Sequence, residues 1–167
     1  MRVSTAPDQG NLATLLNHPA GKMMNQPAIS LCADATIPEA LALFLDRGYH
    51  AAPVIDEAGR PIGVVSMSDL LRHDLDRGTH PSHGERLHGH AVPEGFEVEE
   101  VDTALVCDIM TEAVFTVHLD TPLRSLVQKM LELDVHQLYV VDNEMVLVGV
   151  MSTIDVVRAL NDWSHAE

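Results

Sequence analysis

The chain repeats itself at an offset of 86 residues, and this repeat constrains its fold more than any other feature. Residues 24–72 align with residues 110–158 without a gap, and 11 of the 49 aligned pairs are identical, where about three are expected by chance. The identical pairs are Met24/Met110, Asp34/Asp120, Leu45/Leu131, His50/His136, Val54/Val140, Asp56/Asp142, Gly63/Gly149, Val64/Val150, Ser66/Ser152, Asp69/Asp155 and Arg72/Arg158. Neither copy is long enough to bury a sheet alone, so we expect the copies to pack together about a pseudo-twofold axis.

Each copy is predicted to fold as β-α-β-β-α, an α/β (α+β) arrangement. Short apolar runs indicate the strands, which we place at 28–31, 52–55 and 61–65, and at 114–117, 138–141 and 147–151. Amphipathic patterns indicate the helices, at 37–47 and 67–74, and at 121–133 and 153–161.

Capping residues mark the first helix of each copy. Thr36 and Glu39 have the spacing of a capping box, and Gly48 can end the helix that they begin. In the second copy, Pro122 is expected at the first helical position.

These patterns divide the chain into five parts. An extension (1–19) precedes the first repeat (20–75), an inter-repeat segment (76–103) precedes the second repeat (104–162), and a short tail (163–167) follows. We expect the end of the inter-repeat segment to add a short strand or helix to the second repeat. This segment contains His80, His83, His88 and His90. No cysteine lies among these histidines, and we expect no physiological metal site there.

Composition excludes several functional classes. The formal charge of −15 argues against binding to nucleic acids or to anionic membranes, because both need clustered cations. No apolar run reaches the length of a membrane span, and the first residues lack the apolar stretch of a secretory signal. Two cysteines, Cys32 and Cys107, are too few for a disulfide scaffold. We therefore expect a cytoplasmic protein.

Catalytic motifs are missing from the sequence. It contains no Gly-x-Ser-x-Gly elbow, Walker loop, Rossmann glycine cluster or Cys-x-x-Cys motif. No nucleophile and base are recognisably paired, so an enzyme is the least favoured reading.

The repeat resembles the CBS domain pair, also called the Bateman module. The motif Gly-x-x-Ser-x-x-Asp occurs at 63–69 and again at 149–155, each time at the junction of the third strand and the last helix. The segment 106–110 resembles the leading motif of such a repeat, and 20–24 is a degenerate version of it. The resemblance implies a regulatory module, commonly a disc-like homodimer, that signals to an effector protein.

The resemblance also implies a site for an adenosine ligand: AMP, ADP, ATP with or without magnesium, S-adenosylmethionine or NAD. The motif aspartates would bind the ribose hydroxyls, since a carboxylate accepts two hydrogen bonds from a vicinal diol, and helix starts suit phosphate. No resident cofactor is expected. The implied ligand-binding residues are Ser30, His50, Ala52, Pro53, Ser66, Asp69, Thr116, His136, Leu138, Tyr139, Ser152 and Asp155.

Structural readings compete with these roles. Ser-x-x-Asp is also a capping box, and Arg72 and Arg158 are better placed to pair with the aspartates three residues earlier than with phosphate. His50 and His136 would contact phosphate by similarity to the regulatory subunit of AMP-activated protein kinase, or would be repeated for packing. The kinase repeats often place arginine after this histidine, whereas this chain has Ala51 and Gln137, which weakens a polyphosphate claim.

The two implied sites also differ, because Pro53 in the first repeat corresponds to Tyr139 in the second. Tyrosine can stack on a purine or fill the pocket. The alternative function is therefore a dimerisation or interaction module whose pockets are vestigial and bind no nucleotide.

Overall fold

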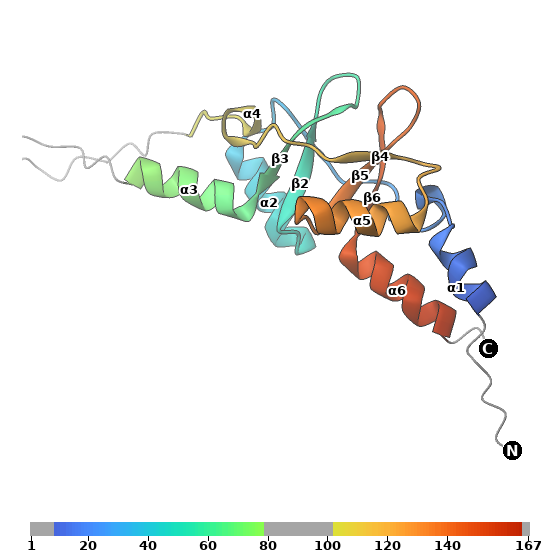
Figure 1. Cartoon of the computed structure of the whole chain (residues 1–167). Helices are drawn as coiled ribbons and strands as arrows, with labels where there is room; N and C mark the ends of the chain where they lie inside the picture. Colours follow the sequence, from blue (N-terminus) through green and yellow to red (C-terminus); the bar gives the residue numbers. More distant parts are fainter. Residues whose placement is uncertain (1–8, 79–101, 165–167) are drawn as a thin grey trace, which may run out of the picture.

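The computed structural model describes residues 9–78 and 102–164, which form two similar halves side by side (Figure 1). The first half contains α1 (Gln9–Leu16), the 3-10 turn η1 (Ala20–Lys22), β1 (Leu31–Cys32), α2 (Ile37–Arg47), β2 (Ala51–Ile55), β3 (Pro61–Ser66) and α3 (Met67–Gly78). The second contains α4 (Val106–Ile109), β4 (Thr116–His118), α5 (Leu123–Leu133), β5 (Gln137–Val141), β6 (Leu147–Ser152) and α6 (Thr153–Ser164).

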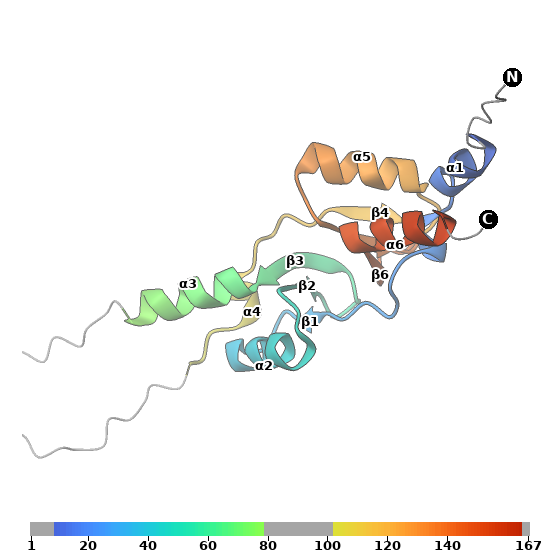
Figure 2. The same ribbon diagram turned by 90° about the horizontal axis from the view of Figure 1, so that it is seen from below.

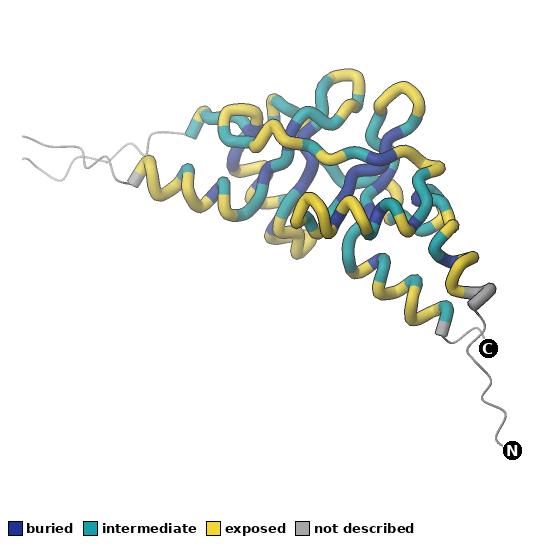
Figure 3. The backbone as a smooth tube through the Cα atoms, viewed as in Figure 1, coloured by how far each residue is buried: buried dark blue, intermediate teal, exposed yellow. Residues whose placement is uncertain are grey.

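Each half holds one three-stranded sheet. The strand orders are β1-β2-β3 and β4-β5-β6, with a parallel first pair and an antiparallel second pair in both. The registers are equivalent, since Val54 pairs with Gly63 and Val140 with Gly149. The predicted β-α-β-β-α order is confirmed for both repeats. Buried residues concentrate in the strands (Figure 3).

Local sequence signals set the helix ends. Thr36 Oγ1 accepts a hydrogen bond from the backbone N–H of Glu39, whose carboxylate accepts one from the backbone N–H of Thr36, so the capping box is confirmed. Gly48 ends α2 at φ 67°, a backbone conformation that glycine adopts without steric cost. The prediction for Pro122 was wrong by one position: it is the N-cap of α5.

Two further predictions need correction. The first strand of the first sheet is Leu31–Cys32 instead of 28–31, and that of the second sheet is Thr116–His118 instead of 114–117. The helix α1 lies in the extension, where no element was predicted. Among the described residues, no helix is long and apolar enough to cross a membrane.

The two halves exchange their leading segments. Leu15 and Ala20 belong to the buried cluster of the second half, with Leu126 and Leu138, and α1 packs against α5 and α6. Conversely, α4 packs against α3 and β3, and Val106 is buried in the cluster of the first half. Figure 2 shows both exchanges, with α4 beside α2 and α3 and with α1 beside α5 and α6.

This exchange corrects the expectation that the segment before the second repeat would add to the second repeat. Asp102 in that segment forms ion pairs with His73 and Arg77 of α3. The first half is therefore held to the start of the second described range by the charge of Asp102 as well as by the apolar packing of α4.

Close approach of the backbone fixes where the exchanged segments attach. A Cβ atom added at Gly63 would overlap the Met110 sulfur and lie 2.9 Å from its Cγ, and one added at Gly149 would meet Met24 in the same way. Glycine at these two strand positions leaves room for the methionine of the other repeat.

Short backbone pairings hold the same contacts. Val64 exchanges two hydrogen bonds with Thr111, both of 2.9 Å, and Val150 exchanges two with Asn25, of 2.9 and 3.1 Å. Each half thus gains a short antiparallel bridge from the other half's leading segment.

We predict that Gly149→Ala destabilises the chain by about 1–3 kcal/mol, because it overfills the space that Met24 occupies. Met24→Ala removes that side chain, so the double variant should be clearly more stable than the sum of the two single effects predicts. Urea unfolding of the four proteins measures this coupling. Strictly additive changes in the free energy of unfolding would show that the contact with Met24 does not limit which side chain fits at position 149.

Candidate functional site

The pseudo-twofold arrangement creates two equivalent clefts, each lined by both repeats. The cleft that we call the Asp69 cleft has a volume of about 500 Å³. Its lining includes Ser66, Asp69 and Arg72 from the first repeat and Thr111, Phe115, His136 and Tyr139 from the second. The Ser152 cleft has a volume of about 480 Å³, and its lining includes Asn25, Ile29, His50, Pro53 and Ser152.

Each motif aspartate caps the helix that begins beside it. Asp69 Oδ2 accepts hydrogen bonds from the Ser66 backbone N–H at 2.8 Å and from the Ser66 hydroxyl at 2.6 Å. Asp155 Oδ2 accepts the same two bonds from Ser152 at the same distances. The capping reading of the motif is confirmed, and it uses only one oxygen of each carboxylate.

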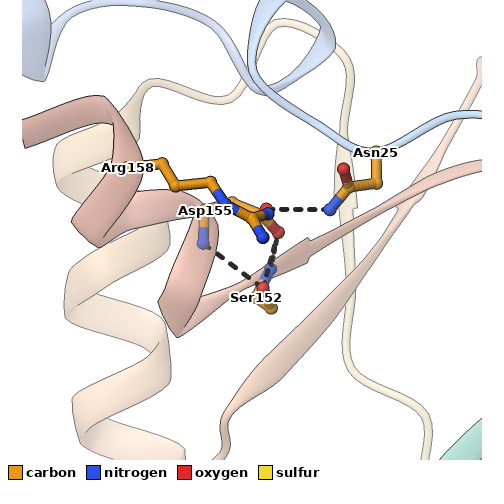
Figure 4. A network of polar contacts seen from close by, with 4 residues as sticks. All are labelled: Asn25, Ser152, Asp155 and Arg158. Carbon is orange, nitrogen blue, oxygen red and sulfur yellow. Dashed lines mark hydrogen bonds and ion pairs between the residues drawn. The ribbon is translucent and has the colours of Figure 1, made fainter. Parts of the chain in front are cut away.

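The second carboxylate oxygen distinguishes the two sites. Asp155 Oδ1 accepts hydrogen bonds from Asn25 Nδ2 at 2.8 Å and from Arg158 Nη1 at 3.0 Å (Figure 4). Asp69 Oδ1 lies 3.4 Å from Arg72 Nη1, and within the described residues Thr111, at the position equivalent to Asn25, donates no bond to it. Both expected local ion pairs are therefore present. Among the described residues, only Asp155 also accepts a hydrogen bond from a side chain of the other repeat.

The exposed fractions of the two aspartate side chains agree with this difference in hydrogen bonding. The side chain of Asp155 is 5% exposed and that of Asp69 is 14% exposed. Burial by itself would raise the pKa of Asp155, but the Ser152 and Asn25 hydrogen bonds and the Arg158 charge outweigh it, so the pKa lies below its usual value.

The Asp69 cleft also has the more aromatic wall. Phe115 and Tyr139 line it, on neighbouring segments joined by a 3.0 Å hydrogen bond from the Tyr139 N–H to the Phe115 carbonyl. Ile29 and Pro53 hold the equivalent positions in the Ser152 cleft. Burial raises the pKa of Tyr139 to about 12, so its hydroxyl stays protonated at neutral pH.

The structure brings most of the predicted residues together, four in each cleft. Ser66, Asp69, His136 and Tyr139 line the Asp69 cleft, and His50, Ala52, Pro53 and Ser152 line the Ser152 cleft. Asp155 stands behind Asn25 and Ser152. The linings of the two clefts do not include Ser30, Thr116 or Leu138, and Leu138 is fully buried in the core.

Sequence reasoning missed the loops that follow the exchanged methionines. Residues 25–29 line the Ser152 cleft, and Thr111, Ala113 and Phe115 line the Asp69 cleft. The two loops align without a gap after Met24 and Met110, and this alignment was the sequence signal that could have indicated them. The four histidines of the inter-repeat segment lie outside the described residues, and the described part contains no group of three metal-ligating side chains.

Comparisons with protein-family models and with known proteins agree on one family. The family model for the CBS domain matches twice, at residues 20–76 and 106–162. A CBS domain-containing protein of Arabidopsis thaliana, CBSX1, is 32% identical over 135 residues, which are 74% of this chain and 55% of that protein. The gamma-3 subunit of 5'-AMP-activated protein kinase from Bos taurus is 29% identical over 75% of this chain and 22% of the subunit.

A solved structure matches most of this chain. The crystal structure of CBSX2 in complex with AMP has a TM-score of 0.67 and 25% identity, covering 88% of this chain and 98% of that one. The chain spans 27%, 55% and 47% of the lengths of three curated relatives that it matches.

We predict that Asp155→Asn lowers the free energy of unfolding by about 1–3 kcal/mol at pH 7, because a charged acceptor with several donors is lost. The pKa of this carboxyl is depressed in the folded state, so its stabilisation is present above the unfolded value and is lost as the pH falls through the lower, folded value. Denaturant unfolding of both proteins from pH 7 to pH 3 should show the difference shrinking. A difference that is independent of pH would contradict the assignment.

Proposed function

Because the chain belongs to the CBS domain family, we propose that it is a regulatory, non-catalytic module that binds an adenosine-containing ligand in the Asp69 cleft and signals to a partner protein. The observation that carries the proposal is the Asp69 carboxylate. Its Oδ2 is fixed by two bonds from Ser66, while among the residues that the structure describes its Oδ1 meets only a long contact from the exposed Arg72. A carboxylate held in this way is oriented to accept hydrogen bonds from a ribose diol.

The surrounding side chains suit the rest of such a ligand. Phe115, which is exposed, offers aromatic surface to a purine ring, and the largely buried Tyr139 lies beside it in the same lining. His136 and the remaining donors of Arg72 line the same cleft and suit a phosphate. With Gln137 rather than arginine after His136, a monophosphate or an uncharged tail fits better than a polyphosphate. The AMP bound to the related CBSX2 supports this ligand class.

The Ser152 cleft is the weaker site in this proposal. Four hydrogen bonds from Ser152, Asn25 and Arg158 already reach Asp155. A ribose would have to displace the Asn25 amide to use this carboxylate, and that exchange costs a formed hydrogen bond. The ligand of the Asp69 cleft contacts both repeats, so its binding would favour one inter-repeat geometry that a partner can distinguish.

We predict that Asp69→Asn weakens AMP binding at least tenfold, because the single amide oxygen is held by the Ser66 donors and an uncharged NH2 donor then faces the ribose hydroxyls. The matched variant Asp155→Asn should leave the affinity of the stronger site within about twofold. Isothermal titration calorimetry with AMP, ADP, ATP with magnesium, NAD and S-adenosylmethionine measures both effects. If the wild-type chain binds none of these, the interaction-module alternative takes first place; if Asp155→Asn has the larger effect, the assignment of the clefts is reversed.

We further propose that the chain forms a homodimer through its helices. Large apolar side chains are exposed on all four long helices of the repeats: Leu45, Leu71, Leu75, Leu131, Ile154 and Val157 are each between 55% and 78% exposed. Figure 3 shows these exposed stretches on α3, α5 and α6. Leu45 and Leu131 hold equivalent positions, so each repeat presents an exposed leucine on its first long helix, and a second copy related by a twofold axis would cover the same surface on both chains.

We predict that Leu45→Glu with Leu131→Glu converts a dimer into a monomer of 18.2 kDa, because it buries charge at the interface. Light scattering coupled to size exclusion measures the mass. Met145→Glu, at an exposed apolar residue of the turn between β5 and β6, is the matched control and should remain dimeric. A monomeric wild-type chain would refute the dimer.

A further inference from the structure

A third cavity lies outside both clefts, between α1, η1 and α6, and has a volume of about 520 Å³. We call it the α1–α6 cavity. The pseudo-twofold repeat does not account for it, because α1 precedes the repeated residues 24–72. Figures 1 and 2 both show α1 close to the C-terminal half of α6.

One part of the cavity wall is apolar. Leu15, Met23, Ala159 and Trp163 line it. The indole Nε1 of Trp163 is buried and has no hydrogen-bond partner among the described residues. Trp163 therefore contributes its ring to the cavity wall, while its N–H makes no hydrogen bond to the described residues.

The remaining wall carries balanced charges. Lys22 and Arg158 contribute positive charge, Asp155 and Asp162 contribute negative charge, and His18 also lines the cavity. The hydrogen bonds of Asp155 are already made, so its charge is committed to Arg158 and its neighbours. Lys22 and Asp162 take part in no ion pair with another residue of the described ranges.

The spacing of these charges fits a zwitterion. Arg158 and Asp162 are four residues apart on α6, so they leave the same helix face with Cβ atoms about 5–6 Å apart. Lys22 faces them from η1. The guanidinium retains donors beyond the one that it gives to Asp155, and so can accept a carboxylate together with Lys22, while Asp162 accepts an ammonium.

We propose that the α1–α6 cavity binds a free α-amino acid with an apolar side chain. Lys22 and Arg158 hold its carboxylate, Asp162 holds its ammonium group, and its side chain lies against Leu15, Met23 and Trp163. This ligand leaves no charge of the cavity uncompensated, whereas a simple anion would face Asp162 and a simple cation would face Lys22. The proposal does not depend on nucleotide binding in either cleft.

Trp163 is the single tryptophan of the chain, so its fluorescence reports on this cavity alone. We expect L-leucine, L-methionine or L-phenylalanine to change its emission saturably in the absence of nucleotide. Three probes remove one feature each: glycine lacks the apolar group, N-acetyl-L-phenylalanine lacks the cation, and L-phenylalaninamide lacks the anion. Each should bind at least tenfold more weakly than L-phenylalanine.

Variants of the charged cavity residues distinguish binding in the α1–α6 cavity from a general effect of amino acids on the protein. Lys22→Gln and Asp162→Asn should each weaken binding of the best amino acid by about tenfold, the loss of one charge pair. Asp76→Asn, at the position equivalent to Asp162 in the first repeat, and Lys129→Gln on α5 should not change it. Calorimetry with the same amino acid confirms the stoichiometry of one per chain.

Three results would overturn the proposal. The first is no saturable signal from any of the three amino acids at millimolar concentration. The second is equal binding of the N-acetyl or amide probe, which would indicate a simple anion or cation site. The third is equal binding by Asp162→Asn and wild type, with both proteins giving the same circular dichroism spectrum.

Discussion

The close contact between a methionine and a strand glycine, made once in each direction, is the constraint on which the rest of the molecule depends. Met110 lies against Gly63 and Met24 against Gly149, and a Cβ atom at either glycine would overlap the methionine sulfur. Each contact lets the leading segment of one repeat pair with the outer strand of the other. Because both cores are completed by the other repeat, the repeats are not independent domains joined by a linker.

The clefts are a consequence of this exchange. The chain that leaves each methionine must pass over the start of the partner repeat's last helix, where the Ser-x-x-Asp motif lies. The motif caps that helix with one carboxylate oxygen, so capping and ligand binding do not compete for the same atom. The residue after the methionine then determines which partner the second carboxylate oxygen has. This residue is Asn25 at Asp155 and Thr111 at Asp69.

Much of this architecture could be predicted from the sequence because its signals are local. The Thr36–Glu39 capping box, the Gly48 helix end and the β-α-β-β-α order depend on neighbours within a few residues. The exchange could not be predicted, because periodicity says which face of an element is apolar but not which sheet will cover it. For the same reason the sequence pointed to Asp69 and both histidines, which line the clefts, but missed the loops opposite them. It also assigned Leu138 to a site although this residue lies in the core.

Asp69 and Asp155 show how two identical motifs come to have different roles. Both keep the serine bonds and the arginine three residues later. Only Asp155 gains the Asn25 amide, and its neighbours Asn25 and Arg158 also line the α1–α6 cavity. Figure 4 shows Asp155 together with Asn25, Ser152 and Arg158, which donate to it. Asp155 lines the α1–α6 cavity, while its partner Ser152 lines the Ser152 cleft. Its counterpart, Asp69, lies across a cleft from a threonine and receives no such amide from the described residues, so one difference in the residue after the methionine gives the two motif aspartates different partners.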